Sequence, residues 1–145
     1  MIYFDTSYLV RLYLEDPGFA AVRDLAATDH VCCAQHGQAE AIAAFHRKFR
    51  ERAFGLKSYR ALLAQFESDN QAEAIRWLPV GPDVMAKILQ VYRDLPSEIY
   101  LRGADATHLA VAAIHGQRTV YSNDVHLLAA AGNFGLKGEN IIPPS

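Results

Sequence analysis

Short apolar runs alternate with longer amphipathic segments along almost the whole chain. The apolar runs predict strands at residues 2–4, 31–34, 75–80, 119–122 and 139–142. The amphipathic segments predict a short first helix that ends near Leu14. They predict further helices over residues 19–26, 38–52, 56–66, 84–95, 104–115 and 125–131. Strands that alternate with helices are typical of an α/β fold, in which helices flank both faces of a central parallel sheet.

The chain has the size and composition of a single domain. Its 145 residues, of which 51% are hydrophobic, are enough for one core and too few for two. The longest uninterrupted apolar stretch, residues 109–114, is far shorter than the ~20 residues that cross a membrane. Cys32 and Cys33 are adjacent in an apolar run, which indicates buried reduced thiols rather than a disulfide or a zinc site. We therefore expect one domain, over residues 1–145, in a soluble cytoplasmic protein without a membrane partner.

Two predicted strands end in an aspartate that stands beside small polar side chains. Asp5 follows the first strand in the stretch FDTS, and Asp124 follows the fourth in YSND. The neighbouring polar residues are Thr6, Ser7, Ser122 and Asn123. Ligands of open α/β sheets bind beyond the carboxyl ends of the strands, so these residues are candidates for a site. Capping of a helix N-terminus, worth ~1 kcal/mol, is the alternative for each aspartate taken singly.

Two further acids, Glu40 and Asp105, fall on predicted helices among small apolar residues. A surface position is the alternative for Glu40, and a charge that complements the helix dipole is the alternative for Asp105. If the four carboxylates meet at one sheet edge, pairs ~5 Å apart repel by a few kcal/mol at an effective dielectric of about 20. A hard divalent cation relieves this repulsion, and oxygen ligands favour Mg²⁺ or Mn²⁺ over zinc. Such a site indicates metal-assisted hydrolysis of a phosphodiester.

These motifs resemble those of the PIN-domain ribonucleases, and among them the VapC-type toxins of toxin–antitoxin pairs. The resemblance covers essentially the whole chain and depends on four features in order. They are DTS at residues 5–7, Glu40, RGADATHLAVA at residues 102–112, and YSND followed by Leu127, Leu128 and Ala131.

The resemblance implies a three-layer PIN fold with Asp5, Glu40, Asp105 and Asp124 as catalytic and metal-binding residues around Mg²⁺ or Mn²⁺. It gives Thr6 and Ser122 supporting roles. It further implies an endoribonuclease that leaves a 5′-phosphate and a 3′-hydroxyl on its RNA substrate. As partners it implies a second copy of the chain, in a homodimer, and a VapB-type antitoxin that offers an arginine to the carboxylates.

Three other features have both a functional and a structural interpretation. The formal net charge of −2 gives no sign of nucleic-acid binding, but Arg47, Lys48, Arg50 and Arg52 can contact RNA phosphates or form a solvated helix face. His108, three residues after Asp105, can join a metal site or pack in the core, and we favour packing. The apolar residues Tyr8, Leu9, Leu12 and Tyr13, with the helices between residues 45 and 66, predict a surface for a dimer or a partner helix.

Other protein classes fit the motifs less well. A phosphatase with an aspartate nucleophile needs a second acid where Ser7 stands, and a phosphoacceptor receiver domain needs a late lysine that does not follow TVYS. A metal-independent ribonuclease would use some of the six histidines, which share no placement at strand ends. A PIN-like module that binds RNA or protein without cutting is the non-enzymatic alternative, and all four acids argue against it.

Overall fold

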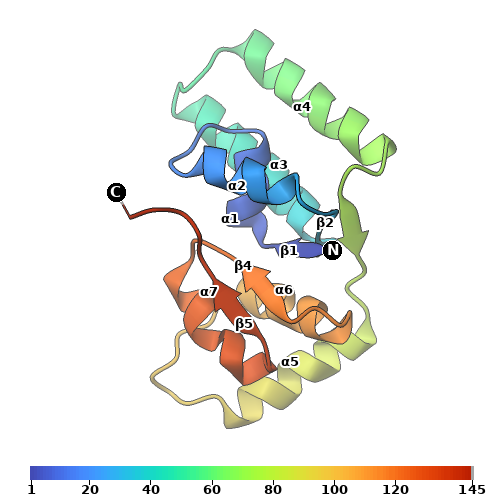
Figure 1. Cartoon of the computed structure of the whole chain (residues 1–145), viewed down its shortest axis with the longest axis vertical. Coiled ribbons are helices and arrows are strands. Elements are labelled where there is room, and N and C mark those ends of the chain that lie inside the picture. Colours follow the sequence, from blue (N-terminus) through green and yellow to red (C-terminus); the bar gives the residue numbers. More distant parts are fainter. Residues whose placement is uncertain (145) are drawn as a thin grey trace.

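A five-stranded parallel sheet forms the centre of the structure, a computed structural model that describes residues 1–144 (Figure 1). The order of the strands across the sheet is β3-β2-β1-β4-β5. Their bounds are β1 Ile2–Phe4, β2 Val31–Ala34, β3 Arg76–Leu78, β4 Thr119–Tyr121 and β5 Lys137–Glu139. Because every pairing is parallel, all carboxyl ends of the strands lie along one edge. This confirms the predicted α/β class.

Helices form a layer on each face of this sheet. One face is covered by α1 Thr6–Leu9, the 3-10 helix η1 Val10–Leu12, α2 Phe19–Ala26, α3 Gly37–Arg50 and α4 Leu56–Gln71. The other is covered by α5 Pro82–Asp94, α6 Gly103–Ile114, α7 Val125–Ala130 and the 3-10 helix η2 Ala131–Phe134. Figure 1 shows the first group in the upper half of the molecule and the second in the lower half. The predicted three layers are therefore confirmed.

Side chains alternate between the two layers along each central strand, as the pleat of a strand requires. Tyr3 and Cys32 belong to the core beneath α5–α7, whereas Phe4 and Cys33 belong to the core beneath α1–α4. All four are fully buried, with exposed fractions of 0%. Both cysteines are free thiols, as predicted.

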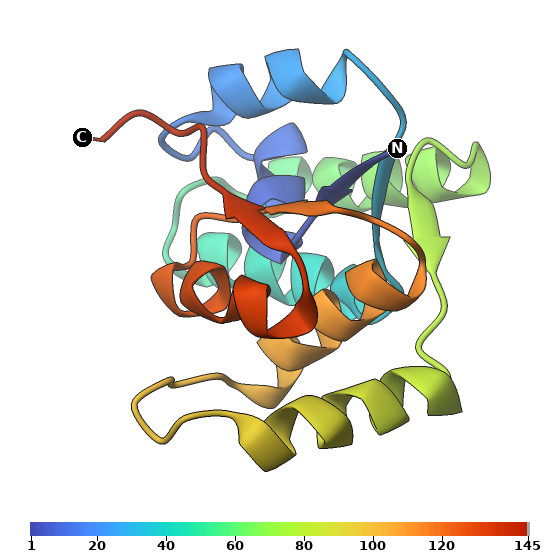
Figure 2. The ribbon, with the colours of Figure 1, turned by 60° about the horizontal axis from the view of Figure 1, so that its bottom comes forward.

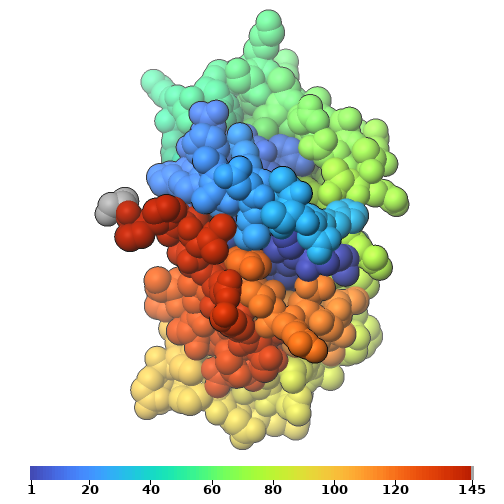
Figure 3. Space-filling model, viewed as in Figure 1, coloured from blue at the N-terminus to red at the C-terminus, as the bar shows by residue number. Residues whose placement is uncertain are grey.

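The last strand begins two residues earlier than the apolar pattern predicts. It spans Lys137–Glu139 instead of residues 139–142. Gly138 makes this position possible, because a Cβ there would lie 2.9 Å from Leu128 Cδ2 of α7. Ile142 instead joins the core beneath α1–α4, close to Gly18. Figure 3 shows this C-terminal segment, in red, against the blue N-terminal part of the chain.

The aromatic and leucine residues that we expected on a partner surface lie mainly in the core. Tyr8 and Leu9 are fully buried in α1. Tyr13 packs edge-on against Phe45 and Phe66, with ring centroids 5.6 and 5.2 Å apart. The surface prediction is wrong for Tyr8 and Leu9, because the fold buries both completely and local periodicity does not show which segment will cover a residue. Leu12 and Tyr13 are partly buried.

The helix order brings the first turn of α6 to the carboxyl edge of the sheet. α1, α3 and α7 start just after β1, β2 and β4. α6 instead precedes β4 and runs toward the amino end of that strand, so its own N-terminus lies at the opposite, carboxyl edge. Figure 2 shows α5 packed outside α6, with a long connection between them that leads into this turn. Within residues 1–144, no helix combines the length and apolarity needed to cross a membrane.

Candidate functional site

Asp5 lies between β1 and α1 and is almost fully buried, with an exposed fraction of 4%. Its Oδ1 accepts hydrogen bonds from the backbone N–H of Tyr8 at 3.1 Å and from Ser7 Oγ at 2.6 Å. Its Oδ2 accepts one from Ser122 Oγ at 2.5 Å. Burial raises the pKa of the Asp5 carboxyl group, although the charge of His108 and these hydrogen bonds act in the opposite direction. The position of this carboxylate therefore favours a nearby cation.

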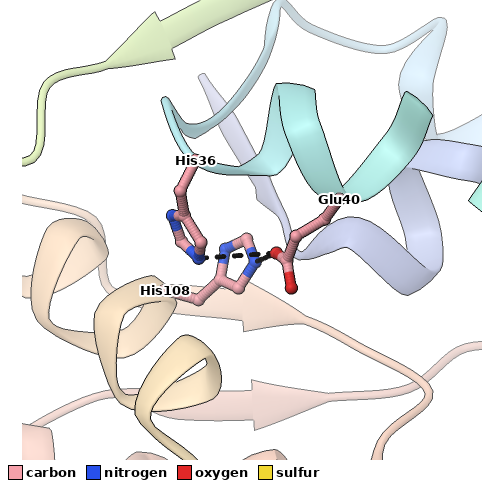
Figure 4. A group of neighbouring side chains, drawn as sticks. All are labelled: His36, Glu40 and His108. Atoms are coloured by element: carbon pink, nitrogen blue, oxygen red, sulfur yellow. Dashed lines mark hydrogen bonds and ion pairs between the residues drawn. The ribbon is translucent and has the colours of Figure 1, made fainter. Parts of the chain in front are cut away.

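Glu40, in the first turn of α3, is held by groups from two other helices, one of which contributes His108 (Figure 4). Its Oε1 accepts hydrogen bonds from Thr6 Oγ1 and from His108 Nε2, both at 2.7 Å. His108 belongs to α6 and is 1% exposed. The functional side chain of α3 is thus oriented by α1 and α6, and His108 is part of the site without being a predicted ligand.

The tautomer of His108 follows from its other neighbour, Tyr3. The backbone N–H of Ala34 donates to the Tyr3 hydroxyl at 3.1 Å, and this hydroxyl lies 2.8 Å from His108 Nδ1. Burial raises the pKa of Tyr3 far above its ordinary value, so the hydroxyl keeps its hydrogen and donates it to Nδ1. Nε2 carries a hydrogen both in this neutral tautomer and in the protonated ring, and it donates that hydrogen to Glu40. A chain of donors therefore runs from the sheet backbone to the carboxylate.

His36 contacts the same carboxylate from the N-terminus of α3. Its Nε2 lies 3.4 Å from Glu40 Oε1 and 3.1 Å from the backbone oxygen of Ala104. Burial lowers the pKa of His36, and the charge of His108 lowers it further, so the ring is neutral near pH 7. A backbone oxygen only accepts, so Nε2 of the neutral ring carries the hydrogen.

The ligand atoms of His36, Glu40 and His108 lie within 4.8 Å of one another, a spacing that could hold a metal ion. In the tautomers that their partners require, both Nε2 atoms carry hydrogen and are donors rather than ligands. We therefore assign the two histidines to the orientation of Glu40. Among residues 1–144, the four predicted carboxylates do not form such a group within that distance.

The pKa of Glu40 makes a testable contribution to stability. Burial alone would raise it, but the hydrogen bond and charge of His108 and the hydrogen bond from Thr6 lower it from 4.5 to about 2. Because the pKa is lower in the folded state, ionised Glu40 stabilises the fold above about pH 4.5, and this contribution is lost as the pH falls toward about 2. The difference in free energy of unfolding between the wild type and Glu40→Gln should therefore shrink below about pH 4.5 in urea denaturation.

Glu67→Gln, at an exposed glutamate of α4, is the matched control for this series. If Glu67→Gln gave the same pH-dependent difference, the hydrogen bonds of Glu40 would not be its cause.

Asp105 and Asp124 meet at a single guanidinium group. Arg102 Nε lies 3.0 Å from Asp105 Oδ2, and Arg102 Nη2 lies 2.8 Å from Asp124 Oδ2. Asp105 is in the first turn of α6, and Asp124 is the residue before α7. The two acids therefore come from different elements and share one positive charge at the sheet edge.

Helix capping and membership of the site are compatible for Asp5 and Asp124. Oδ1 of Asp5 caps α1, and Oδ1 of Asp124 caps α7 through the N–H groups of His126 and Leu127. The second oxygen of each aspartate accepts another hydrogen bond: Oδ2 of Asp5 accepts from Ser122, and Oδ2 of Asp124 accepts from Arg102. The capping interpretation is therefore correct for one oxygen of each, and the caps orient the other. Asp105 makes no such cap and is paired with Arg102 instead.

The predicted supporting residues connect these carboxylates. Ser122 Oγ donates to Asp5 and accepts from the backbone N–H of Asp124 at 2.9 Å. Ser7 Oγ likewise donates to Asp5 and accepts from the backbone N–H of Asn123 at 3.0 Å. Thr6 joins Glu40 to the same segment as Asp5. The side chain of Asn123 points to Asn140 rather than to an acid.

The predicted RNA-contacting cluster lies at the far end of α3. Arg47, Lys48 and Arg50 are in the last turn of this helix, about 10–15 Å along its axis from Glu40, and Arg52 follows it. Lys48 pairs with Asp16 at 2.9 Å and Arg47 pairs with Glu51 at 3.6 Å. Phe49 stacks on Tyr59 within the protein, with ring centroids 4.7 Å apart.

Sequence reasoning missed three residues that shape the site: Tyr3, His36 and Arg102. The spacings His36–Glu40 and Arg102–Asp105 are those of neighbours on a helix face, so these two contacts had a readable signal. No sequence signal predicted the contact of Arg102 with Asp124 or that of Tyr3 with His108, because each joins segments that only the fold brings together.

Comparisons with known proteins agree with the fold. A family model described as PIN domain matches residues 2–133. Comparison with curated proteins finds no match.

Several solved structures have the same fold. VapC20 of Mycobacterium tuberculosis, described as a sarcin-ricin loop cleaving toxin, is 22% identical with a TM-score of 0.68, over 90% of this chain and 95% of that one. FitAcB from Neisseria gonorrhoeae is 20% identical with a TM-score of 0.72, over 95% and 96%. VapBC2 from Rickettsia felis, bound to a DNA fragment from their promoter, is 14% identical with a TM-score of 0.68, over 97% and 98%.

Proposed function

This chain belongs to the PIN-domain family, and we propose on that basis that it is a divalent-metal-dependent endoribonuclease that acts as the toxin of a toxin–antitoxin pair. The observation that carries the proposal is the set of acids at the carboxyl edge of the sheet, two of which share the cationic group of Arg102. The sarcin-ricin loop cleavage stated for VapC20 and the toxin–antitoxin complex from Klebsiella pneumoniae, which has the same fold, support it.

The side chains present fit a hard cation. The candidate ligands Asp5, Glu40, Asp105 and Asp124 offer only carboxylate oxygens, the kind that Mg²⁺ and Mn²⁺ prefer. The guanidinium group between Asp105 and Asp124 acts as a stand-in for a cation, since it occupies a position where positive charge is favourable. A bound divalent ion would activate water and offset negative charge on the phosphate.

The residues around the acids have separable roles in this proposal. Ser7 and Ser122 hold Asp5, which is buried and therefore fixed in direction. Thr6 and His108 hold Glu40 and keep it ionised at neutral pH. Preorganised carboxylates need no rearrangement when a cation and a phosphate arrive, which is the main contribution of a protein to such catalysis.

The partners belong to the same proposal. We propose an antitoxin of the VapB type, because VapBC2 is described with its promoter DNA and shares the fold of this chain.

We also propose a homodimer. The exposed side chains Met85, Leu89 and Tyr92 recur along α5 at the spacing of one helix face and form an exposed apolar surface.

The proposed activity predicts cleavage that depends on the metal. Purified protein should cut structured RNA when Mn²⁺ or Mg²⁺ is added, stop when EDTA removes the ion, and resume when Mn²⁺ is restored in excess. The products should carry 5′-phosphate and 3′-hydroxyl ends, measured by ligation and end-labelling. Cleavage that survives EDTA would point to the histidine mechanism, and RNA binding without cleavage would point to the non-catalytic module.

A further inference from the structure

Arg102 contacts two of the candidate metal ligands, so it bears directly on how the site binds an ion. Its guanidinium group reaches Asp105 with Nε at 3.0 Å and Asp124 with Nη2 at 2.8 Å. In both cases the acceptor is Oδ2. Oδ1 of Asp124 is already engaged in capping α7, so Oδ2 is the oxygen that Asp124 can offer to any cation.

The three side chains differ in how firmly they are held. Asp105 and Asp124 are largely buried, with 11% and 23% of their side chains exposed, whereas the Arg102 side chain is 57% exposed. Arg102 also precedes α6 in extended conformation, and its side chain makes no hydrogen bond that caps this helix. The carboxylates are therefore fixed, and the guanidinium group is the member of the trio that can leave.

A divalent ion bound by Asp105 and Asp124 would compete with Arg102 for the same oxygens. Two like-charged carboxylates close enough to share one guanidinium group repel each other, and either a bound ion or the arginine relieves this repulsion. If the ion and the guanidinium group of Arg102 bound the same two oxygens at once, the two positive charges would repel each other. The side chain of Arg102 is long and exposed enough to move into solvent. Breaking an ion pair of such an exposed side chain costs little free energy.

We propose that Arg102 is a built-in counter-cation of the acidic site, which binds Asp105 and Asp124 when no divalent ion is present and is displaced when one binds. The inference depends on the proposed function, because it requires that these acids bind the ion. It has two consequences. Arg102 stabilises the metal-free protein, and it weakens the affinity for the metal.

The test measures Mn²⁺ binding without RNA, by isothermal titration calorimetry at low ionic strength. Arg102→Gln should bind Mn²⁺ about tenfold more tightly than the wild type, a coupling of ordinary size between two ligands of one site. Arg102→Lys keeps the charge but cannot span both acids, so its affinity should lie between the two. Arg93→Gln, at an exposed arginine in the last turn of α5, is the matched control and should bind like the wild type.

Thermal denaturation gives a second readout. In EDTA, Arg102→Gln should melt at a lower temperature than the wild type, and saturating Mn²⁺ should narrow this gap. A purely structural role would lower the melting temperature without tightening metal binding.

The outcomes separate this inference from the proposed function. Equal or weaker Mn²⁺ binding by Arg102→Gln would overturn the role of Arg102, while metal-dependent RNA cleavage by the wild type would still stand. If neither protein bound Mn²⁺, both proposals would fall together.

Discussion

Asp5→Asn should abolish RNA cleavage while leaving the protein folded. An amide is a poor ligand for a hard cation and carries no charge, so the loss of rate should reach at least about 100-fold. The fold should survive because the amide oxygen of the variant can still accept the hydrogen bonds that Tyr8 and Ser7 donate to Asp5 Oδ1. Burial also raises the pKa of Asp5, so its ionised form opposes folding at neutral pH, and a neutral side chain removes that penalty.

The measurements are the initial rate of RNA cleavage in Mn²⁺ and the free energy of unfolding in urea. Expression of the wild type should arrest growth of the host, and expression of the variant should not. Asp24→Asn is the matched control, since Asp24 is exposed in α2, which leads back to the amino end of β2. If Asp5→Asn kept the wild-type rate, Asp5 would be a helix cap and no more. If it failed to fold, capping would be its main role.

His108→Ala should destabilise the fold and release Glu40. The ring is 1% exposed and links the Tyr3 hydroxyl to Glu40 through hydrogen bonds of 2.8 and 2.7 Å. Its removal leaves a cavity and an unpaired buried hydroxyl group, which together should lower the free energy of unfolding by about 3–5 kcal/mol. The pKa of Glu40 should rise from about 2 toward its ordinary value of 4.5, because its strongest donor is gone.

Urea denaturation measures the first effect, and NMR titration of the Glu40 side chain measures the second. His115→Ala is the matched control, because His115 follows the same helix and is only partly buried. A large loss of stability without a change in the pKa of Glu40 would mean that His108 packs in the core but does not orient the carboxylate. A rise in that pKa would show that the histidine acts on the site itself.

Much of the fold was predictable because hydrophobic periodicity is a local property. The strand near residues 2–4 and the helix that carries Phe19, Val22, Leu25 and Ala26 lie where the pattern predicts them. The prediction failed at residues 139–142, where two isoleucines suggested a strand. Ile142 is partly buried and packs against the core beneath α1–α4 instead. The segment with Gly138 takes the sheet position, since it can lie against Leu128 where a Cβ would not fit. Apolar content alone does not show which surface a residue will cover.

The candidate acids were predictable for a related reason. Asp5 and Asp124 follow strands directly, and parallel strands place their carboxyl ends together, so a local pattern implies a common edge. The prediction did not extend to the contacts of those acids. Asp5 meets Ser122 across 117 positions of sequence, and Arg102 meets Asp124 across 22. No spacing rule covers such pairs.

The sequence by itself determined the alternation of strands and helices and the placement of acids at strand ends, because both depend on neighbouring residues. Only the tertiary structure decided which oxygen of each acid caps a helix, which histidine orients Glu40, and that Arg102 lies between Asp105 and Asp124. Those contacts depend on the order of strands in the sheet, which sets distant segments side by side. The chemistry of the site therefore depends on contacts between residues that are distant in the sequence, which interactions between sequence neighbours do not specify.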